Sequence, residues 1–122
     1  MVAVTPPEEV TVVNKTFASA WGGVGSEYGG YIIQTSDGGY AVTGGTNDGG
    51  GDMFLAKYSV SGVQEWNKTW GGTGDEGGVS LVQTSDGGYL IAGSTNSFGA
   101  TQRDAFILKY DASGNLLWNK LW

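Results

Sequence analysis

The chain contains the heptapeptide Gln-Thr-Ser-Asp-Gly-Gly-Tyr twice, at residues 34–40 and again at residues 83–89. The two copies start 49 residues apart, and the residues around them repeat as well. The clearest matches, first copy to second, are Trp21-Gly22-Gly23 to Trp70-Gly71-Gly72, Lys57-Tyr58 to Lys109-Tyr110, and Trp66 to Trp118. A period near 50 residues is typical of a propeller blade or a solenoid turn. We therefore expect two copies of one structural unit.

Each unit consists of short segments with strand composition, separated by turns that contain glycine. In the first unit the predicted strands are Tyr31–Thr35, Tyr40–Thr43, Met53–Tyr58 and Gln64–Trp70. Their β-branched and aromatic residues favour strands, and no segment shows a sustained helical period. The strands are apolar on both faces, which indicates sheets that are covered on both sides. We predict an all-β fold with two four-stranded antiparallel β-propeller blades per chain.

The repeated heptapeptide places a hairpin turn in each unit. Aspartate and glycine tolerate positive φ, which two-residue hairpin turns require. The expected turn residues are Asp37, Gly38, Gly39, Asp86, Gly87 and Gly88. A later segment, Asp111–Asn115, has oxygen ligands spaced like half of a calcium loop, but it lacks a closing glutamate. We interpret it as another hairpin turn and predict no metal site.

The repeat divides the chain into four parts. Residues 1–12 form a proline-containing tail, residues 13–21 an extra outer-type strand, residues 22–70 the first blade and residues 71–122 the second. At the repeat offset, Phe17 aligns with Trp66, and Trp21 aligns with Trp70. The segment 13–21 therefore matches the fourth strand of a preceding blade.

Two blades cannot close a propeller, because propellers typically contain four to eight. An isolated pair of blades would also expose two apolar flanks. We therefore expect identical chains to assemble head to tail into a closed ring, with a trimer or tetramer favoured over a pentamer. The alternative is that the chain is a segment of a longer natural array.

Composition excludes several classes of function. The chain has no cysteine and no histidine, so it lacks thiolate ligands and the commonest general base. Its net charge of −6 argues against nucleic acid, which requires a basic surface. No stretch is long and apolar enough to form a membrane helix, and Met1–Val4 is too short for a signal peptide. We expect no enzyme, no catalytic residue, no cofactor, no nucleic-acid partner and no membrane insertion.

The segment from Leu108 to Trp118, with Asp111, Gly114 and Trp118, resembles the tryptophan-docking motif of quinoprotein (PQQ-type) propellers. The whole repeat, over about residues 16–122, resembles the secreted β-propeller repeats of bacterial and archaeal surface proteins. This resemblance implies an extracellular or cell-surface location. The first unit departs from the motif, because Ser59 stands where the second has Asp111. The calcium site, cofactor-stacking groups and catalytic carboxylate of quinoprotein dehydrogenases are not recognisable here.

Tryptophan residues at equivalent positions are the main functional candidates. We predict that the aromatic rings at matched positions pack between blades, namely Trp66, Trp118, Phe17, Trp21, Trp70 and Trp122. This favours a non-enzymatic scaffold or interaction module. The alternative is a multivalent carbohydrate-binding propeller, in which Trp21, Trp70 and Trp122 present their rings beside glycine loops. Loop carboxylates at Glu27, Asp75 and Glu76 would then contact the glycan, although solvated loop charge is the simpler interpretation.

Overall fold

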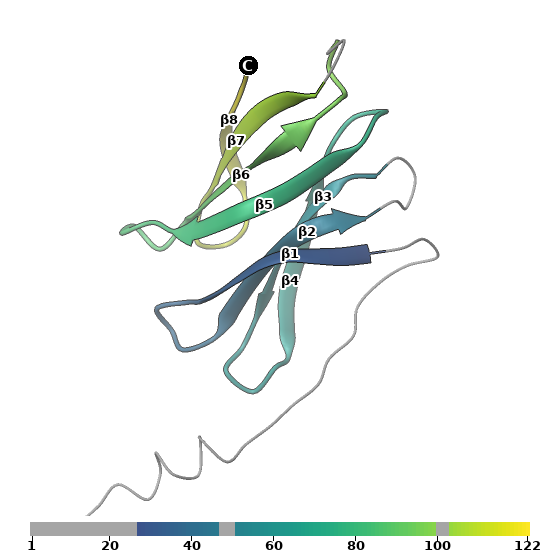
Figure 1. Cartoon of the computed structure of the whole chain (residues 1–122). Helices are drawn as coiled ribbons and strands as arrows, with labels where there is room; N and C mark the ends of the chain where they lie inside the picture. The colour runs from purple at the N-terminus through teal and green to yellow at the C-terminus, as the bar shows by residue number, and fades with distance from the viewer. Residues whose placement is uncertain (1–26, 47–50, 100–102) are drawn as a thin grey trace, which may run out of the picture.

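The computed structural model describes residues 27–46, 51–99 and 103–122, apart from the side chains of Glu27, Tyr28 and Val79. The described residues form two antiparallel sheets, each with four strands in sequence order (Figure 1). The N-terminal sheet comprises β1 (Glu27–Gln34), β2 (Tyr40–Thr46), β3 (Met53–Tyr58) and β4 (Gln64–Trp70). The C-terminal sheet comprises β5 (Glu76–Gln83), β6 (Tyr89–Thr95), β7 (Asp104–Tyr110) and β8 (Leu116–Leu121). The predicted all-β class and antiparallel sheets are confirmed.

Two strands extend further than their composition predicted. β1 begins at Glu27 rather than Tyr31, and its register shifts between Gly29 and Tyr31. β2 continues through Gly44 and Gly45, which pair with Phe54 and Met53 of β3. Glycine is unfavourable in a strand by itself, so these extensions depend on pairing with neighbouring strands. The tail 1–12 and the strand predicted at 13–21, including Phe17 and Trp21, lie outside the described residues.

The turns β1–β2, β3–β4, β5–β6 and β7–β8 share one geometry. In the first, Thr35 N–H donates to Gly39 O at 2.9 Å and Gly38 N–H donates to Thr35 O at 2.9 Å. The corresponding turns begin at Ser59, Thr84 and Asp111, and their fourth residue is always a glycine with φ between 85° and 87°. The predicted positions of the heptapeptide turns are confirmed, but the expected two-residue length was wrong. The chain makes a longer turn in which only glycine takes the left-handed conformation.

Aspartate has a different role in the heptapeptide turns. The Oδ1 atom of Asp37 accepts hydrogen bonds from Thr35 Oγ1 at 2.6 Å and from the Gly39 amide at 3.0 Å. Asp86 repeats both contacts in the second copy, with Thr84 Oγ1 and the Gly88 amide. The carboxylate therefore fixes the turn through hydrogen bonds rather than through its own backbone conformation.

Each sheet has two chemically different faces. The face that carries the tryptophan residues of the fourth strand is called the tryptophan face, and the opposite face is called the tyrosine face. In the N-terminal sheet the tryptophan face includes Ile33, Ala41, Met53, Leu55, Trp66 and Trp70, as the strand register shows. In the C-terminal sheet the tyrosine face includes Leu81, Tyr89, Ile91, Phe106, Leu108 and Tyr110.

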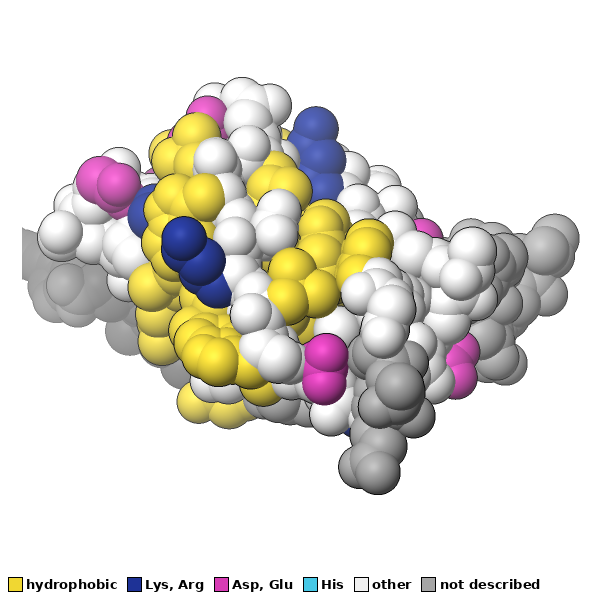
Figure 2. Space-filling view, turned by 90° about the horizontal axis from the view of Figure 1, so that it is seen from above, with side chains coloured by type: hydrophobic (Ala, Val, Ile, Leu, Met, Phe, Trp, Pro, Cys, Tyr) yellow, Lys and Arg dark blue, Asp and Glu magenta, His cyan; other side chains and the backbone are white. Residues whose placement is uncertain are grey.

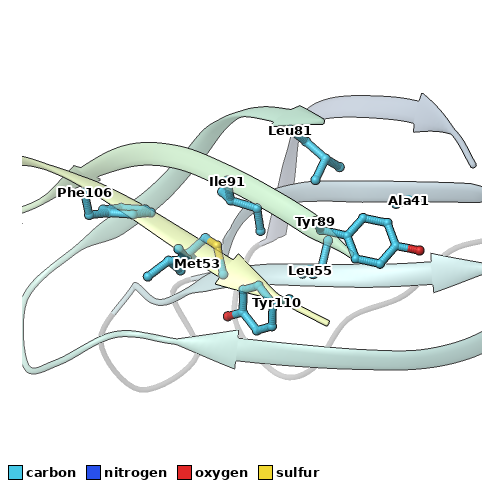
Figure 3. Close-up of a cluster of buried hydrophobic side chains, with 9 residues drawn as sticks. Ala41, Met53, Leu55, Leu81, Tyr89, Ile91, Phe106 and Tyr110 are labelled. Carbon is cyan, nitrogen blue, oxygen red and sulfur yellow. The ribbon is translucent and has the colours of Figure 1, made fainter. Parts of the chain in front are cut away.

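The hydrophobic core joins the tryptophan face of the N-terminal sheet to the tyrosine face of the C-terminal sheet (Figure 3). Strand β5 lies against β1, β2 and β3 of the other sheet. Close approach requires glycine, because a Cβ atom on Gly30 would lie 2.5 Å from the carbonyl oxygen of Gly78. A Cβ atom on Gly78 would overlap Thr43 Oγ1. The two sheets are therefore stacked head to tail, with unlike faces in contact.

Candidate functional site: the junction between the sheets

Trp66 of β4 spans the junction at one end. Its ring meets the ring of Tyr89 edge to face, with centroids 5.9 Å apart and an interplanar angle of 71°. The same ring covers the turn between β7 and β8, because a Cβ atom on Gly114 would lie 2.9 Å from it. Gly114 also has a φ of 86°, so glycine is required there by conformation and by space. The tryptophan of one sheet thus sits over a glycine turn of the other.

Trp70 spans the junction at the other end of β4. Its ring centroid lies 4.9 Å from that of Phe106 and 5.1 Å from that of Phe98. Phe98 has a φ of 56°, a conformation that no other non-glycine residue adopts in the described ranges. These neighbouring rings partly cover Trp70, which argues against its prediction as an open glycan platform.

Polar contacts connect the sheets beside these rings. The amide of Ser36, in the β1–β2 turn, donates to Gln83 Oε1 at 2.8 Å. Gln83 in turn donates from Nε2 to Gly87 O at 3.1 Å, which holds its side chain in place. At the opposite end, the Glu76 amide donates to Gly51 O at 2.6 Å. These directional bonds fix how one sheet is placed on the other.

Glu76 is not a solvated loop carboxylate. Its residue surface is only 1% exposed, and its Oε1 atom accepts hydrogen bonds from the Gly72 amide at 2.7 Å and from Ser97 Oγ at 2.6 Å. The interpretation of this side chain as solvated loop charge was therefore wrong. Because its oxygens are already bonded within the protein, Glu76 has a structural rather than a ligand-binding environment.

A second carboxylate, Asp52, lies beside Glu76. Its Oδ1 atom is buried and has no hydrogen-bond partner within the described part of the chain. A Cβ atom on Gly71 would overlap Asp52 Oδ1 and would lie 3.0 Å from Glu76 Oε1, so both oxygens face the same glycine. Burial, and then the charge of Glu76, raise the pKa of Asp52. The carboxylate of Glu76 thus has hydrogen-bond partners in the junction, whereas ionisation of the neighbouring Asp52 carboxylate is unfavourable.

Lysine side chains reinforce the aspartate turns. Lys57 is 4% exposed, and its Nζ atom donates to Asp37 Oδ2 at 3.0 Å, Glu65 Oε1 at 3.1 Å and Tyr58 O at 3.1 Å. Burial opposes the charge on Lys57, but its bonds to Asp37 and Glu65 outweigh this effect and raise its pKa. This ion pair was not predicted, although its aspartate and lysine occur at matching positions in both copies.

The second copy keeps most of this arrangement. Lys109 Nζ donates to Asp86 Oδ2 at 3.3 Å and to Tyr110 O at 3.1 Å. It also contacts Thr84 Oγ1 at 3.2 Å, whereas Leu117 stands in the repeat position of Glu65. The repeated aspartate–lysine pair therefore has a structural role in both sheets.

Among the described residues, no second sheet packs on the tryptophan face of the C-terminal sheet. Trp118, which matches Trp66, is 43% exposed, and Trp122, which matches Trp70, is 65% exposed. Val82 on the same face is also exposed. The view onto the upper end of the molecule shows hydrophobic side chains gathered over this part of the fold (Figure 2). Equivalent tryptophan residues thus have different environments in the two sheets.

The tyrosine face of the N-terminal sheet carries both exposed and buried side chains. Ile32 is 62% exposed, and Tyr40, Val42 and Tyr58 are half-buried. Phe54 and Ala56, on the same face, are already buried. This face carries the same kinds of side chain that pack against Trp66 and Trp70 in the observed junction.

In the part of the chain that the structure describes, the remaining predicted site residues do not form a reactive cluster. Asp75 is exposed, and Glu27 begins β1 with a side chain outside the described set. Asp111 Oδ1 accepts hydrogen bonds from the Ser113 and Asn115 amides at 2.9 and 2.8 Å, as a hairpin turn requires. In the other repeat, Ser59 Oγ accepts from the Val63 amide at 3.1 Å, so serine replaces aspartate in this role.

The described ranges contain neither a cluster of metal ligands nor a membrane-spanning helix. No group of three or more acidic, histidine or cysteine side chains is placed to hold a metal ion there. Among the same residues, no helix has the length and hydropathy to cross a bilayer.

These features define an all-β repeat protein of two stacked antiparallel sheets. No protein-family model matches the chain, and comparison with characterised proteins also finds no match. The junction itself is therefore the best guide to function.

Proposed function

We propose that the chain is a non-enzymatic β-propeller scaffold and interaction module that assembles head to tail with copies of itself. The main supporting observation is the difference between equivalent tryptophan residues. Trp66 packs against Tyr89 in the junction, whereas Trp118 is 43% exposed. A second copy that presents its tyrosine face would give Trp118 the environment that Trp66 already has.

The two sheet faces determine the type of assembly. Because unlike faces pack together within the chain, repeating the same contact between chains joins the tryptophan face of one copy to the tyrosine face of the next. Such a heterologous contact leads to a ring if the rotation closes and to a filament if it does not. Six or eight blades would require three or four chains, and propellers commonly have these blade numbers. We propose an extracellular or cell-surface location for this scaffold.

The expected gain is large enough to support association. A fully buried tryptophan removes roughly 150–250 Å² from water. From the exposed fractions of Trp118 and Trp122, 43% and 65%, docking would bury roughly 200 Å² more of these two rings. At about 25 cal/mol/Å² this contributes roughly 5 kcal/mol. Association costs on the order of 4–15 kcal/mol, so the remaining apolar surface of the two faces must also take part.

Solution mass measured by light scattering tests the proposal. We expect the unmodified chain at micromolar concentration to give a whole-number multiple of 12.7 kDa, with three or four copies favoured. Trp118→Ala should shift the mass toward that of the single chain without loss of the strand signal in circular dichroism. Trp66→Ala is the matched control. Because Trp66 lies in the junction within the chain, this variant should lower the melting temperature of each chain. A folded, unmodified chain that stays monomeric would exclude this function.

A further inference from the structure

We propose that a hydrogen bond from the Ser85 amide of one copy to Gln34 Oε1 of the next copy sets the register of the assembly. This inference rests on the proposed head-to-tail association and names the polar contact that would orient it. The partner is a second copy of this chain, presented through the β1–β2 edge of its N-terminal sheet.

The existing contact joins Ser36 to Gln83 across the junction. The Ser36 amide donates to Gln83 Oε1 at 2.8 Å, although the residues belong to different sheets. Gln83 Nε2 donates to Gly87 O at 3.1 Å and so holds the acceptor oxygen toward the first sheet. The bond uses the backbone of the serine and the side chain of the glutamine. It therefore requires the turn geometry as well as the glutamine.

Ser85 and Gln34 occupy the corresponding positions in the other copy of the heptapeptide. Because all seven residues are identical, both turns have the same closing bonds, with 2.9 Å in each case. Gln34 Nε2 also approaches the carbonyl oxygen of its own turn, Gly38 O, at 3.5 Å. The donor turn and the acceptor side chain are therefore both present in the single chain, one on each sheet.

Both groups are accessible in the single chain. Ser85 and Gln34 are exposed. Across the described ranges, the Ser85 amide has no acceptor corresponding to Gln83, and Gln34 Oε1 has no donor corresponding to Ser36. Repeating the internal junction between copies would bring these two groups together.

A directional bond is needed because apolar contact alone specifies position weakly. Burial of hydrophobic surface depends mainly on area and has little directional preference. A hydrogen bond between a backbone amide and a side-chain oxygen tolerates only small displacements. We therefore assign Gln34 as a positioning residue that selects a neighbour with the correct register. The aromatic rings would supply most of the association energy.

Cross-linking between two single-cysteine variants tests this contact directly. The chain has no native cysteine, so Ser85→Cys and Gln34→Cys each introduce one defined attachment point. Ser85→Cys preserves the backbone amide. A short bismaleimide should link the two variants when they are mixed, and should give much less product with either variant alone. The in-chain control, Ser36→Cys with Gln83→Cys, should cross-link within one chain.

The energetic test uses Gln34→Leu, which removes the hydrogen-bonding groups at similar side-chain size. We expect the dissociation constant between copies to rise roughly two- to tenfold, as for loss of one hydrogen bond. Oligomers of unmodified chain that show neither this effect nor the mixed cross-link would overturn the proposed bond while leaving head-to-tail association intact. A monomeric unmodified chain would overturn both proposals.

Discussion

Trp66 and Tyr89 meet edge to face, with ring centroids 5.9 Å apart, although they belong to different sheets. Tyr89 closes the second copy of the heptapeptide, so the same residue ends a turn and receives a tryptophan from the other sheet. One repeated sequence thus supports local turn geometry and sheet stacking.

Trp66→Ala should destabilise the folded chain by roughly 3–5 kcal/mol, because it removes a large ring from the junction. Trp118→Ala should have a much smaller effect on an isolated chain, since its ring is 43% exposed. Urea unfolding of both variants at low chain concentration measures this difference. Equal destabilisation would contradict the assignment of Trp66 to the intramolecular junction.

Gly114→Ala should be more destabilising than Gly87→Ala. Both glycines have left-handed φ values, 86° and 85°, so either substitution costs roughly 1–2 kcal/mol in backbone conformation. A Cβ atom at 114 would also lie 2.9 Å from the Trp66 ring, whereas at 87 the nearest atom, Ala112 Cβ, is 3.6 Å away. Overpacking should add roughly 1–3 kcal/mol at Gly114 only. Thermal unfolding of the two variants provides the comparison.

The folded chain should become less stable in acid, because the aspartate side chains of the turns become protonated. Hydrogen bonds from Thr84 and the Gly88 amide, followed by that from Lys109, lower the pKa of Asp86 from 3.8 to about 2. Because the pKa of Asp86 is lower in the folded chain than in the unfolded chain, the ionised carboxylate stabilises the fold above about pH 4. This stabilisation is lost as the pH falls from about 4 toward 2. Melting temperatures across this range should therefore decrease, with a shallower decrease for Asp86→Asn. An unchanged slope in that variant would contradict the contribution of this turn.

Asp52→Asn should have the opposite pH dependence. Burial and the charge of Glu76 raise the pKa of Asp52, so its ionisation opposes folding. Below pH 3.8, the ordinary pKa of aspartate, Asp52 is protonated and this penalty is absent. The penalty develops as the pH rises through the raised pKa of Asp52 in the folded chain. The variant should therefore be more stable than the unmodified chain at pH 7 and should lose this advantage in acid. Melting curves at pH 7 and pH 3.5 distinguish this outcome from a pH-independent change.

Much of the local structure was predictable because it depends on nearby residues. Strand composition correctly located β3 and β4, and the heptapeptide located the first turn of each repeat. The conformation of that turn was less predictable, since Asp37 acts through its side chain while Gly38 takes the left-handed φ. Ser59 stands at the repeat position of Asp111 and departs from the motif there. The turn is nevertheless kept, because the serine hydroxyl oxygen accepts the same kind of hydrogen bond from a backbone amide as the aspartate carboxylate does.

The environments of the junction residues were not predictable from local patterns. Glu76 looks like a loop carboxylate, but β5 carries it into the junction, where Gly72 and Ser97 supply its hydrogen bonds. Ser97 is distant in sequence, so no spacing rule connects the two residues. Asp52 and Lys57 were missed for the same reason, because burial depends on which face the second sheet covers.

The sequence by itself determined that this chain forms two similar antiparallel sheets, since strand propensity and glycine turns act over a few residues and occur twice. Only the tertiary structure decided that unlike faces pack together. It therefore distinguished Trp66, which contacts Tyr89, from Trp118, which is exposed. The physical reason is that two identical motifs have the same local preferences, but stacking two sheets gives each of them a different set of neighbours.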